Sequence, residues 1–208
     1  MPRSGDPRPQ RLVELLALPR RSPLHAELAL ALGAADALHV LHTDLHPVPV
    51  RPTTAQVRRG CYRSRGGDPV DLRVSARSGS VPLSLLHELG HLVDHQLAPE
   101  PGRFASRGHP ALRGWRRAVR RLPSRAPRHA GPSHRRYFDS FRELWARSYA
   151  QTALRLAPDP RLRAHLAELQ RADDPFVWPD EDFAVVAAEV ETALARLGLL
   201  RAAVGRAA

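Results

Sequence analysis

Apolar residues recur at the three- and four-residue spacing of helices along most of the chain, while one early stretch alternates apolar and polar residues. That stretch, residues 70–76, predicts a half-buried strand. Residues 40–50 and 57–62 also favour strands, and Pro47 and Pro49 make the first of them short or an edge strand. The helical spacing predicts helices over residues 12–18, 24–38, 82–97, 110–122, 133–156, 161–171 and 183–199.

A small sheet early in the chain, followed by helices, predicts an α+β fold. The 208 residues fit a single domain, 1–208, with a sheet-and-helix part over about 1–97 and a helical part over about 109–200. Hydrophobic residues make up 43% of the sequence but aromatic residues only 5%, so the core must consist mainly of Leu, Val and Ala.

The charge of the chain is strongly positive, at +11 with neutral histidines. All 32 basic residues are arginine, which is typical of a GC-rich genome, and a basic balance also favours nucleic acid or an acidic surface as partner. The charges are segregated: eleven arginines and no acid lie between Arg103 and Arg136, and seven acids and no arginine lie between Asp173 and Glu191. These segments are either two solvated faces or a basic rim beside a site, with the acidic stretch able to lie across it.

Cys61 is the sole cysteine, so no internal disulfide is expected. The first ten residues lack the apolar core of a secretory signal, and residues 12–18 are too short and too charged to span a membrane. We therefore expect a cytoplasmic protein without a membrane partner.

The sequence His87-Glu88-Leu89-Gly90-His91 carries the strongest chemical signal. Histidines four apart on a helix project from one face and can bind a single ion, and the glutamate beside the first can take a proton from a metal-bound water. A strand precedes this helix, Ser80 is a candidate N-cap, and Pro82 suits its first turn. The pattern predicts a zinc hydrolase site. The alternative is a chance match, in which the two histidines are ordinary surface residues.

Catalytic zinc needs a third protein ligand. His95 continues the spacing but lies about 12 Å along the helix from His87, and Asp94 is also a turn too far. The best donor is Glu143 in the predicted helix 133–156, because Ala146 and Ala150 share its face and would let two helices approach closely. The alternative is a surface Glu143 paired with Arg147.

The segments His-Glu-Leu-Gly-His-Leu-Val-Asp-His and Glu-Leu-Trp-Ala-Arg-Ser-Tyr resemble the gluzincins, above all the branch with the anthrax lethal factor catalytic domain and the minigluzincins. The resemblance covers roughly residues 70–155. It implies a zincin-like fold and zinc held by His87, His91 and Glu143. It also implies that Tyr137 donates a hydrogen bond to the tetrahedral intermediate. In zincins an extended substrate pairs with an edge strand, and we expect residues 70–76 to be that edge.

One position departs from the family pattern. Many gluzincins carry an acid four residues after the ligand glutamate, where this sequence has Arg147. Because ligating histidines generally need an outer acceptor, Asp139, Asp94 or a backbone carbonyl is expected to serve instead.

The sequence thus predicts a zinc-dependent metallopeptidase with one Zn²⁺ per chain and a peptide or protein substrate. Glu88 acts as the general base, and Tyr137, or His129 or His134, stabilises the oxyanion. Minigluzincins also suggest self-inhibition, here by the acidic residues 173–182. The alternative is a nucleic-acid-associated zinc protein, or a regulatory non-catalytic homologue, that uses the basic block between Arg103 and Arg136.

Overall fold

Within the part of the chain that the structure describes, four strands form the main sheet, in the order β2-β4-β6-β5. The computed structural model describes residues 8–54, 59–127 and 129–201. β4 pairs in parallel with β2 and with β6, and β5 pairs antiparallel with β6. A separate antiparallel pair joins β1 and β3. The strands are β1 (Pro9–Gln10), β2 (Leu16–Ala17), β3 (Leu41–His42), β4 (Val48–Thr53), β5 (Gly60–Arg65) and β6 (Asp68–Ser75).

The edge strands of this sheet are β2 and β5, and β6 lies between β4 and β5. The expectation that residues 70–76 form the edge is therefore wrong. The hairpin between the two strands turns at Gly66 and Gly67, whose φ angles of 60° and 94° suit glycine. This turn lays β5 along one side of β6, while β4 occupies the other side. Residues 57 and 58 of the predicted strand 57–62 lie outside the described residues.

Eight α-helices within the described ranges account for the predicted helical segments. They are α1 (Leu12–Leu15), α2 (His25–Leu38), α3 (Val81–Gln96), α4 (Arg113–Val119), α5 (Pro132–Phe138), α6 (Phe141–Arg155), α7 (Pro160–Arg171) and α8 (Asp180–Arg196), with the 3₁₀ turns η1 (Ala105–Arg107) and η2 (Pro110–Leu112). The predicted helix 12–18 is shorter than expected and continues as β2. The predicted helix 110–122 begins as η2 and ends at Val119.

The predicted single helix over residues 133–156 is two helices, α5 and α6. The break lies at Ser140, whose backbone is extended and whose hydroxyl accepts a hydrogen bond of 3.4 Å from the N–H of Glu143. The end of α5 is held by Arg147, which donates a hydrogen bond of 2.6 Å to the carbonyl of Phe138. A new N-cap therefore starts α6 three residues before Glu143.

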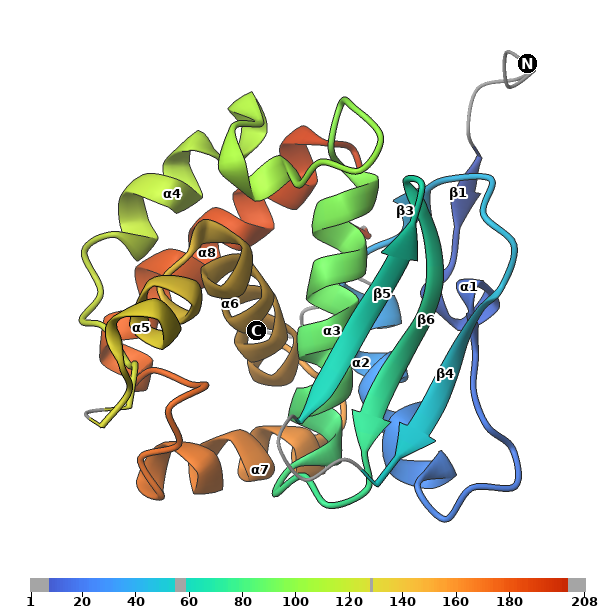
Figure 1. The fold of residues 1–208 in the computed structure, drawn as a ribbon, viewed down its shortest axis with the longest axis horizontal. Helices are drawn as coiled ribbons and strands as arrows, with labels where there is room; N and C mark the ends of the chain where they lie inside the picture. The colour runs from blue at the N-terminus through green and yellow to red at the C-terminus, as the bar shows by residue number, and fades with distance from the viewer. Residues whose placement is uncertain (1–7, 55–58, 128, 202–208) are drawn as a thin grey trace.

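Helix α3 lies at the centre of the molecule, with the strands on one side and helices α4 to α8 on the other (Figure 1). Its residues from Val81 to His95 are all buried. One hydrophobic cluster of the described residues joins the sheet, α3 and the C-terminal helices. The fold is α+β, as predicted, and its central helix is the one that carries His87 and His91.

Candidate metal centre

Local sequence signals define where α3 begins. The Ser80 hydroxyl accepts a hydrogen bond of 3.1 Å from the N–H of Leu83, and Pro82 lies in the first turn. The apolar residues Leu85, Leu86, Leu89, Leu92 and Val93 are each fully buried. The helix is therefore packed on several sides, and its two histidines face α6.

Helices α3 and α6 approach closely where small residues meet. A Cβ atom at Gly90 would lie 2.9 Å from Cα of Ala146 and 3.1 Å from its carbonyl oxygen. The indole N–H of Trp145 also donates a hydrogen bond of 3.1 Å to the carbonyl of Gly90. The close approach of the helices that was expected at Ala146 is confirmed. The sequence did not identify Gly90 as the matching small residue on α3, because this glycine stands out there only as part of the histidine motif.

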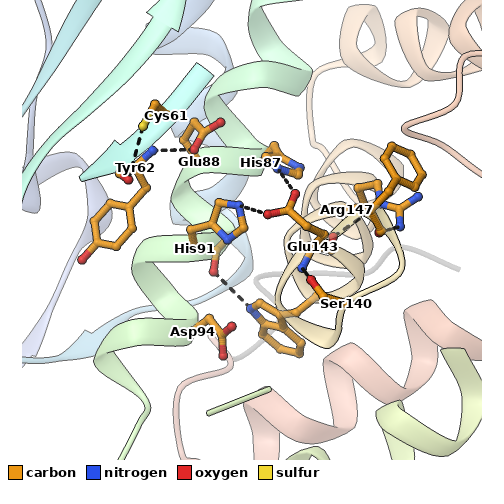
Figure 2. Close-up of polar contacts among 12 residues, drawn as sticks. Cys61, Tyr62, His87, Glu88, His91, Asp94, Ser140, Glu143 and Arg147 are labelled. Atoms are coloured by element: carbon orange, nitrogen blue, oxygen red, sulfur yellow. Dashed lines mark hydrogen bonds and ion pairs between the residues drawn. The ribbon is translucent and has the colours of Figure 1, made fainter. Parts of the chain in front are cut away.

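This approach brings His87, His91 and Glu143 together. Nε2 of His87 lies 3.3 Å from Oε2 of Glu143, and Nε2 of His91 lies 3.3 Å from Oε1. Figure 2 shows the two rings turning from α3 toward the carboxylate on α6. One potential ligand atom from each residue lies within 4.8 Å of the others. The three residues form a buried cluster that could hold a metal ion.

The protonation states of the cluster suit metal binding, which requires neutral imidazole and ionised carboxylate. Burial lowers the pKa of His91 to about 4, so the ring is neutral near pH 7. Burial raises the pKa of Glu143, but the close contacts of its carboxylate with the rings of His87 and His91 outweigh burial, and the net direction is strongly downward. Glu143 is therefore ionised at neutral pH.

Neither expected outer acceptor reaches the two histidines. Within the described residues, the buried Nδ1 atoms of His87 and His91 have no hydrogen-bond partner. Asp139 instead accepts hydrogen bonds of 2.7 and 2.9 Å from the Ser124 hydroxyl. Asp94 accepts two from Ser106, 2.6 Å from its N–H and 2.7 Å from its hydroxyl.

Arg147, four residues after Glu143, is a buried structural residue. It is 1% exposed, and its guanidinium lies 3.8 Å from the ring centre of Phe138 and 4.8 Å from that of Trp178. Its Nε donates a hydrogen bond of 3.4 Å to the carbonyl of Glu143. Arg147 therefore fixes the backbone of the third candidate ligand rather than orienting a histidine.

Glu88 points away from α6, toward the edge strand (Figure 2). Its Oε2 accepts a hydrogen bond of 2.6 Å from the N–H of Tyr62 on β5. A Cβ atom at Gly60 would lie 2.6 Å from Oε1 of Glu88 and 2.8 Å from the carbonyl oxygen of Arg73. Burial, together with the charge of Glu143, raises the pKa of Glu88 to about 7. Gly60 and Tyr62 were not singled out from sequence, because only the pairing of β5 with β6 places them against α3.

Tyr137 lies near the end of α5 and is 54% exposed. Burial and the negative charge of the Glu143 carboxylate raise the pKa of its phenol. His134 stacks on Phe138 with 6.2 Å between ring centres, and His129 lies exposed. Tyr137 is therefore the helper candidate that lies close enough to Glu143 for the carboxylate charge to act on its phenol.

The connection between α7 and α8 covers one side of the cluster. The ring of Phe176 lies 5.6 Å from that of His87, edge to face. Asp174 forms an ion pair of 2.7 Å with Arg59, whose guanidinium lies 4.5 Å from the ring centre of Phe176. Trp178, interpreted from sequence as a core residue rather than a substrate contact, is 1% exposed. No sequence signal identified Phe176 or Arg59.

Several arginines of the basic block between Arg103 and Arg136 have partners within the fold. Arg116 donates to the carbonyl of His109 at 3.0 Å, and the guanidinium of Arg120 lies 4.8 Å from the ring centre of Phe141. Arg125 pairs with Asp173 at 2.6 Å, which links the basic block to the acidic stretch.

Comparison of the chain with protein-family models, curated proteins and solved structures finds no match in any of the three. Among the helices of the described residues, none combines the length and the apolar character needed to cross a membrane.

Proposed function

We propose that this chain is a zinc-dependent metallopeptidase with a zincin-like arrangement, which hydrolyses peptide bonds within proteins or peptides. The observation that supports this function best is the buried cluster of His87, His91 and Glu143, with Glu88 next to its first histidine on the same helix. Two imidazoles and one carboxylate are a ligand set of catalytic zinc sites, which keep a further position open. The gluzincin resemblance predicts the same three ligands.

The residues present fit a zinc ion. Oε1 of Glu143 is buried and lies 3.3 Å from Nε2 of His91, yet it makes no hydrogen bond of acceptable geometry among the described residues. A buried carboxylate oxygen without a partner is costly, and a cation between the three side chains would satisfy it. Imidazole and carboxylate together favour zinc over calcium or magnesium, which prefer oxygen ligands alone.

Bound at this cluster, zinc supplies a Lewis acid that polarises a carbonyl and lowers the pKa of water. The chain's own groups do the remaining work. Glu88 accepts the proton of the attacking water, and the N–H of Tyr62 holds its carboxylate in place at 2.6 Å. Tyr137 donates a hydrogen bond to the oxyanion that develops on the former carbonyl oxygen. The edge strand β5 pairs with the main chain of an extended substrate.

Self-inhibition is part of this proposal, but we assign it to Phe176 rather than to the acidic residues of the same segment. Asp173, Asp174 and Asp180 are paired with arginines, and Phe176 is the residue of this stretch that contacts His87. Phe176 therefore competes with substrate for the space beside the first histidine, and the pairing of Arg59 with Asp174 holds it there.

Metal content and peptide cleavage, measured on three variants, test the proposed function. Glu143→Ala removes a ligand and is expected to weaken zinc binding at least about 100-fold, since changes outside the ligand set already cost 10- to 100-fold. Glu88→Gln is expected to keep zinc and to lose at least about 100-fold in cleavage of a peptide library. The exposed Glu168→Gln on α7 serves as the matched control and changes neither.

The zinc-binding result and the cleavage result test separate parts of the proposal. Unchanged zinc affinity in Glu143→Ala would show that Glu143 is not a ligand. Zinc bound at full affinity without cleavage of any library peptide, by either the wild-type chain or a Phe176→Ala variant that relieves the proposed self-inhibition, would rule out the peptidase and leave a structural or regulatory metal site.

A further inference from the structure

Arg142 carries a positive charge beside the metal centre. It precedes Glu143 on α6, and its guanidinium carbon lies 4.4 Å from the ring centre of Phe104. Among the described residues no carboxylate forms an ion pair with Arg142, and its buried Nε has no hydrogen-bond partner. A guanidinium stacked on an aromatic face presents its remaining N–H groups as a fixed fork.

A chain of contacts connects Arg142 to the proposed base. The Phe104 ring lies 5.5 Å from that of His95, and Nδ1 of His95 lies 2.6 Å from the hydroxyl of Tyr62. The N–H of Tyr62 in turn binds Glu88. Burial is the largest cause of the pKa shifts, upward for Glu88 and downward for His95, and the positive charge of Arg142 acts to lower the pKa of both groups.

The distance along the site between the metal cluster and Arg142 determines which residue of a bound peptide can contact Arg142. The ring of Phe104 is tilted by 35° against that of His95. His95 lies one helical turn beyond His91, which corresponds to a rise of roughly 6 Å along α3. An extended peptide advances about 3.3–3.6 Å per residue. A group bound at Arg142 therefore belongs to a residue one or two positions from the bond that lies at the metal.

We propose that Arg142 is a specificity-determining residue that binds a carboxylate of the substrate peptide close to the scissile bond. The carboxylate is either the side chain of Asp or Glu or the free α-carboxylate at the peptide's C-terminus. Carboxylates match the fork of a guanidinium through paired charge-assisted hydrogen bonds. As an account of substrate choice, this inference rests on the proposed peptidase function.

Binding to a zinc-loaded Glu88→Gln background separates recognition from cleavage. Fluorescence anisotropy at low salt compares three labelled peptides of one sequence: internal Glu with an amidated end, internal Gln with an amidated end, and internal Gln with a free C-terminal carboxylate. We expect one or both carboxylate peptides to bind about tenfold more tightly than the neutral peptide. The carboxylate peptide whose affinity exceeds that of the neutral peptide shows whether Arg142 binds the side-chain carboxylate or the C-terminal one.

Two further substitutions in the same background attribute the preference to Arg142. Arg142→Gln is expected to abolish it, and Arg142→Glu to reverse it in favour of a peptide with internal Lys, which a purely structural arginine would not do. Arg103→Gln is the control, because Arg103 is an exposed arginine nearby that pairs with Glu100. This variant keeps the preference.

The outcomes separate this inference from the proposed function. Three results would overturn the role of Arg142: equal binding of all peptides, no binding of any peptide, or a preference that survives Arg142→Gln. Each of them does so even if the wild-type zinc protein cleaves the neutral peptide. If the Arg142-dependent preference is present and neither wild-type nor Phe176→Ala zinc protein cleaves any of the peptides, the carboxylate site stands and the peptidase proposal falls.

Discussion

The N–H of Tyr62 donates a hydrogen bond of 2.6 Å to Oε2 of Glu88, so the edge strand β5 holds the carboxylate that follows the first histidine of α3. The two residues come from different layers of the fold. Because this N–H belongs to the backbone, no substitution at Tyr62 other than proline removes it. The spacing between β5 and α3 instead depends on the glycine two residues earlier.

Gly60→Ala should disturb Glu88 without touching a metal ligand. The new Cβ would lie 2.6 Å from Oε1 of Glu88 and 2.8 Å from the carbonyl oxygen of Arg73, which cannot move without shifting β6. We expect the free energy of unfolding to fall by about 1–3 kcal/mol, cleavage to fall, and zinc content to stay unchanged. Urea unfolding and zinc stoichiometry measure this. Gly79→Ala, which meets nothing within 4 Å, is the control, and equal stability of the two variants would contradict the prediction.

Gly90→Ala should separate the two helices that supply the ligands. Its Cβ would lie 2.9 and 3.1 Å from backbone atoms of Ala146, so α6 must move away from α3. We expect zinc affinity to fall at least about tenfold, because a small displacement of Glu143 spoils the ligand geometry. A competition titration with a zinc chelator measures the affinity.

The control for Gly90→Ala is Gly33→Ala on α2, also in a helix but with nothing within 4 Å. Alanine favours a helix by up to about 1 kcal/mol over glycine, so this variant should be slightly more stable, with unchanged zinc affinity. If Gly90→Ala behaves in the same way, the close approach of the helices is not what positions Glu143.

Asp94 should make the fold less stable as the pH rises from about 4 to about 7. Burial raises its pKa to about 7, despite two hydrogen bonds from Ser106. Because the folded-state pKa lies above the unfolded one, the stabilisation is complete below about pH 4 and is lost as the pH approaches 7. The loss amounts to roughly 3 kcal/mol.

Asp94→Asn keeps both partners of Ser106 and cannot ionise. The difference in unfolding free energy between wild type and Asp94→Asn, measured by urea titration at several pH values, should therefore fall across this window. A difference that stays flat, or that grows with pH, would show that Asp94 is ionised in the fold.

Phe176→Ala should raise peptide cleavage, because it removes the ring that lies 5.6 Å from that of His87. Truncating the chain after residue 172 is a poorer test, since it removes Trp178 and helix α8, whose Phe183 and Val190 are fully buried. Initial rates on the peptide library measure the effect. Val185→Ala, on an exposed part of α8, is the control, and unchanged or lower activity in Phe176→Ala at full zinc content would count against self-inhibition.

The sequence by itself determined the central helix and the face that its histidines share. The Ser80 cap, Pro82 and the apolar positions act within one or two turns, so α3 begins and ends within a residue of the predicted range. The spacing of His87 and His91 is likewise a local property of a helix. The α+β class also follows from local periodicity, because strands and helices differ in their repeat.

Only the tertiary structure decided what surrounds that helix. Which strand forms the sheet edge depends on hydrogen bonds between distant segments, so the pattern of residues 70–76 could not show that β5 lies outside β6. The approach of Glu143 to the histidines depends on the contact of Gly90 with Ala146, 56 positions along the chain, and on a helix break at Ser140 that periodicity does not reveal. The positions of Tyr62, Phe176 and Arg142 around the cluster follow from these long-range contacts, which no local pattern encodes.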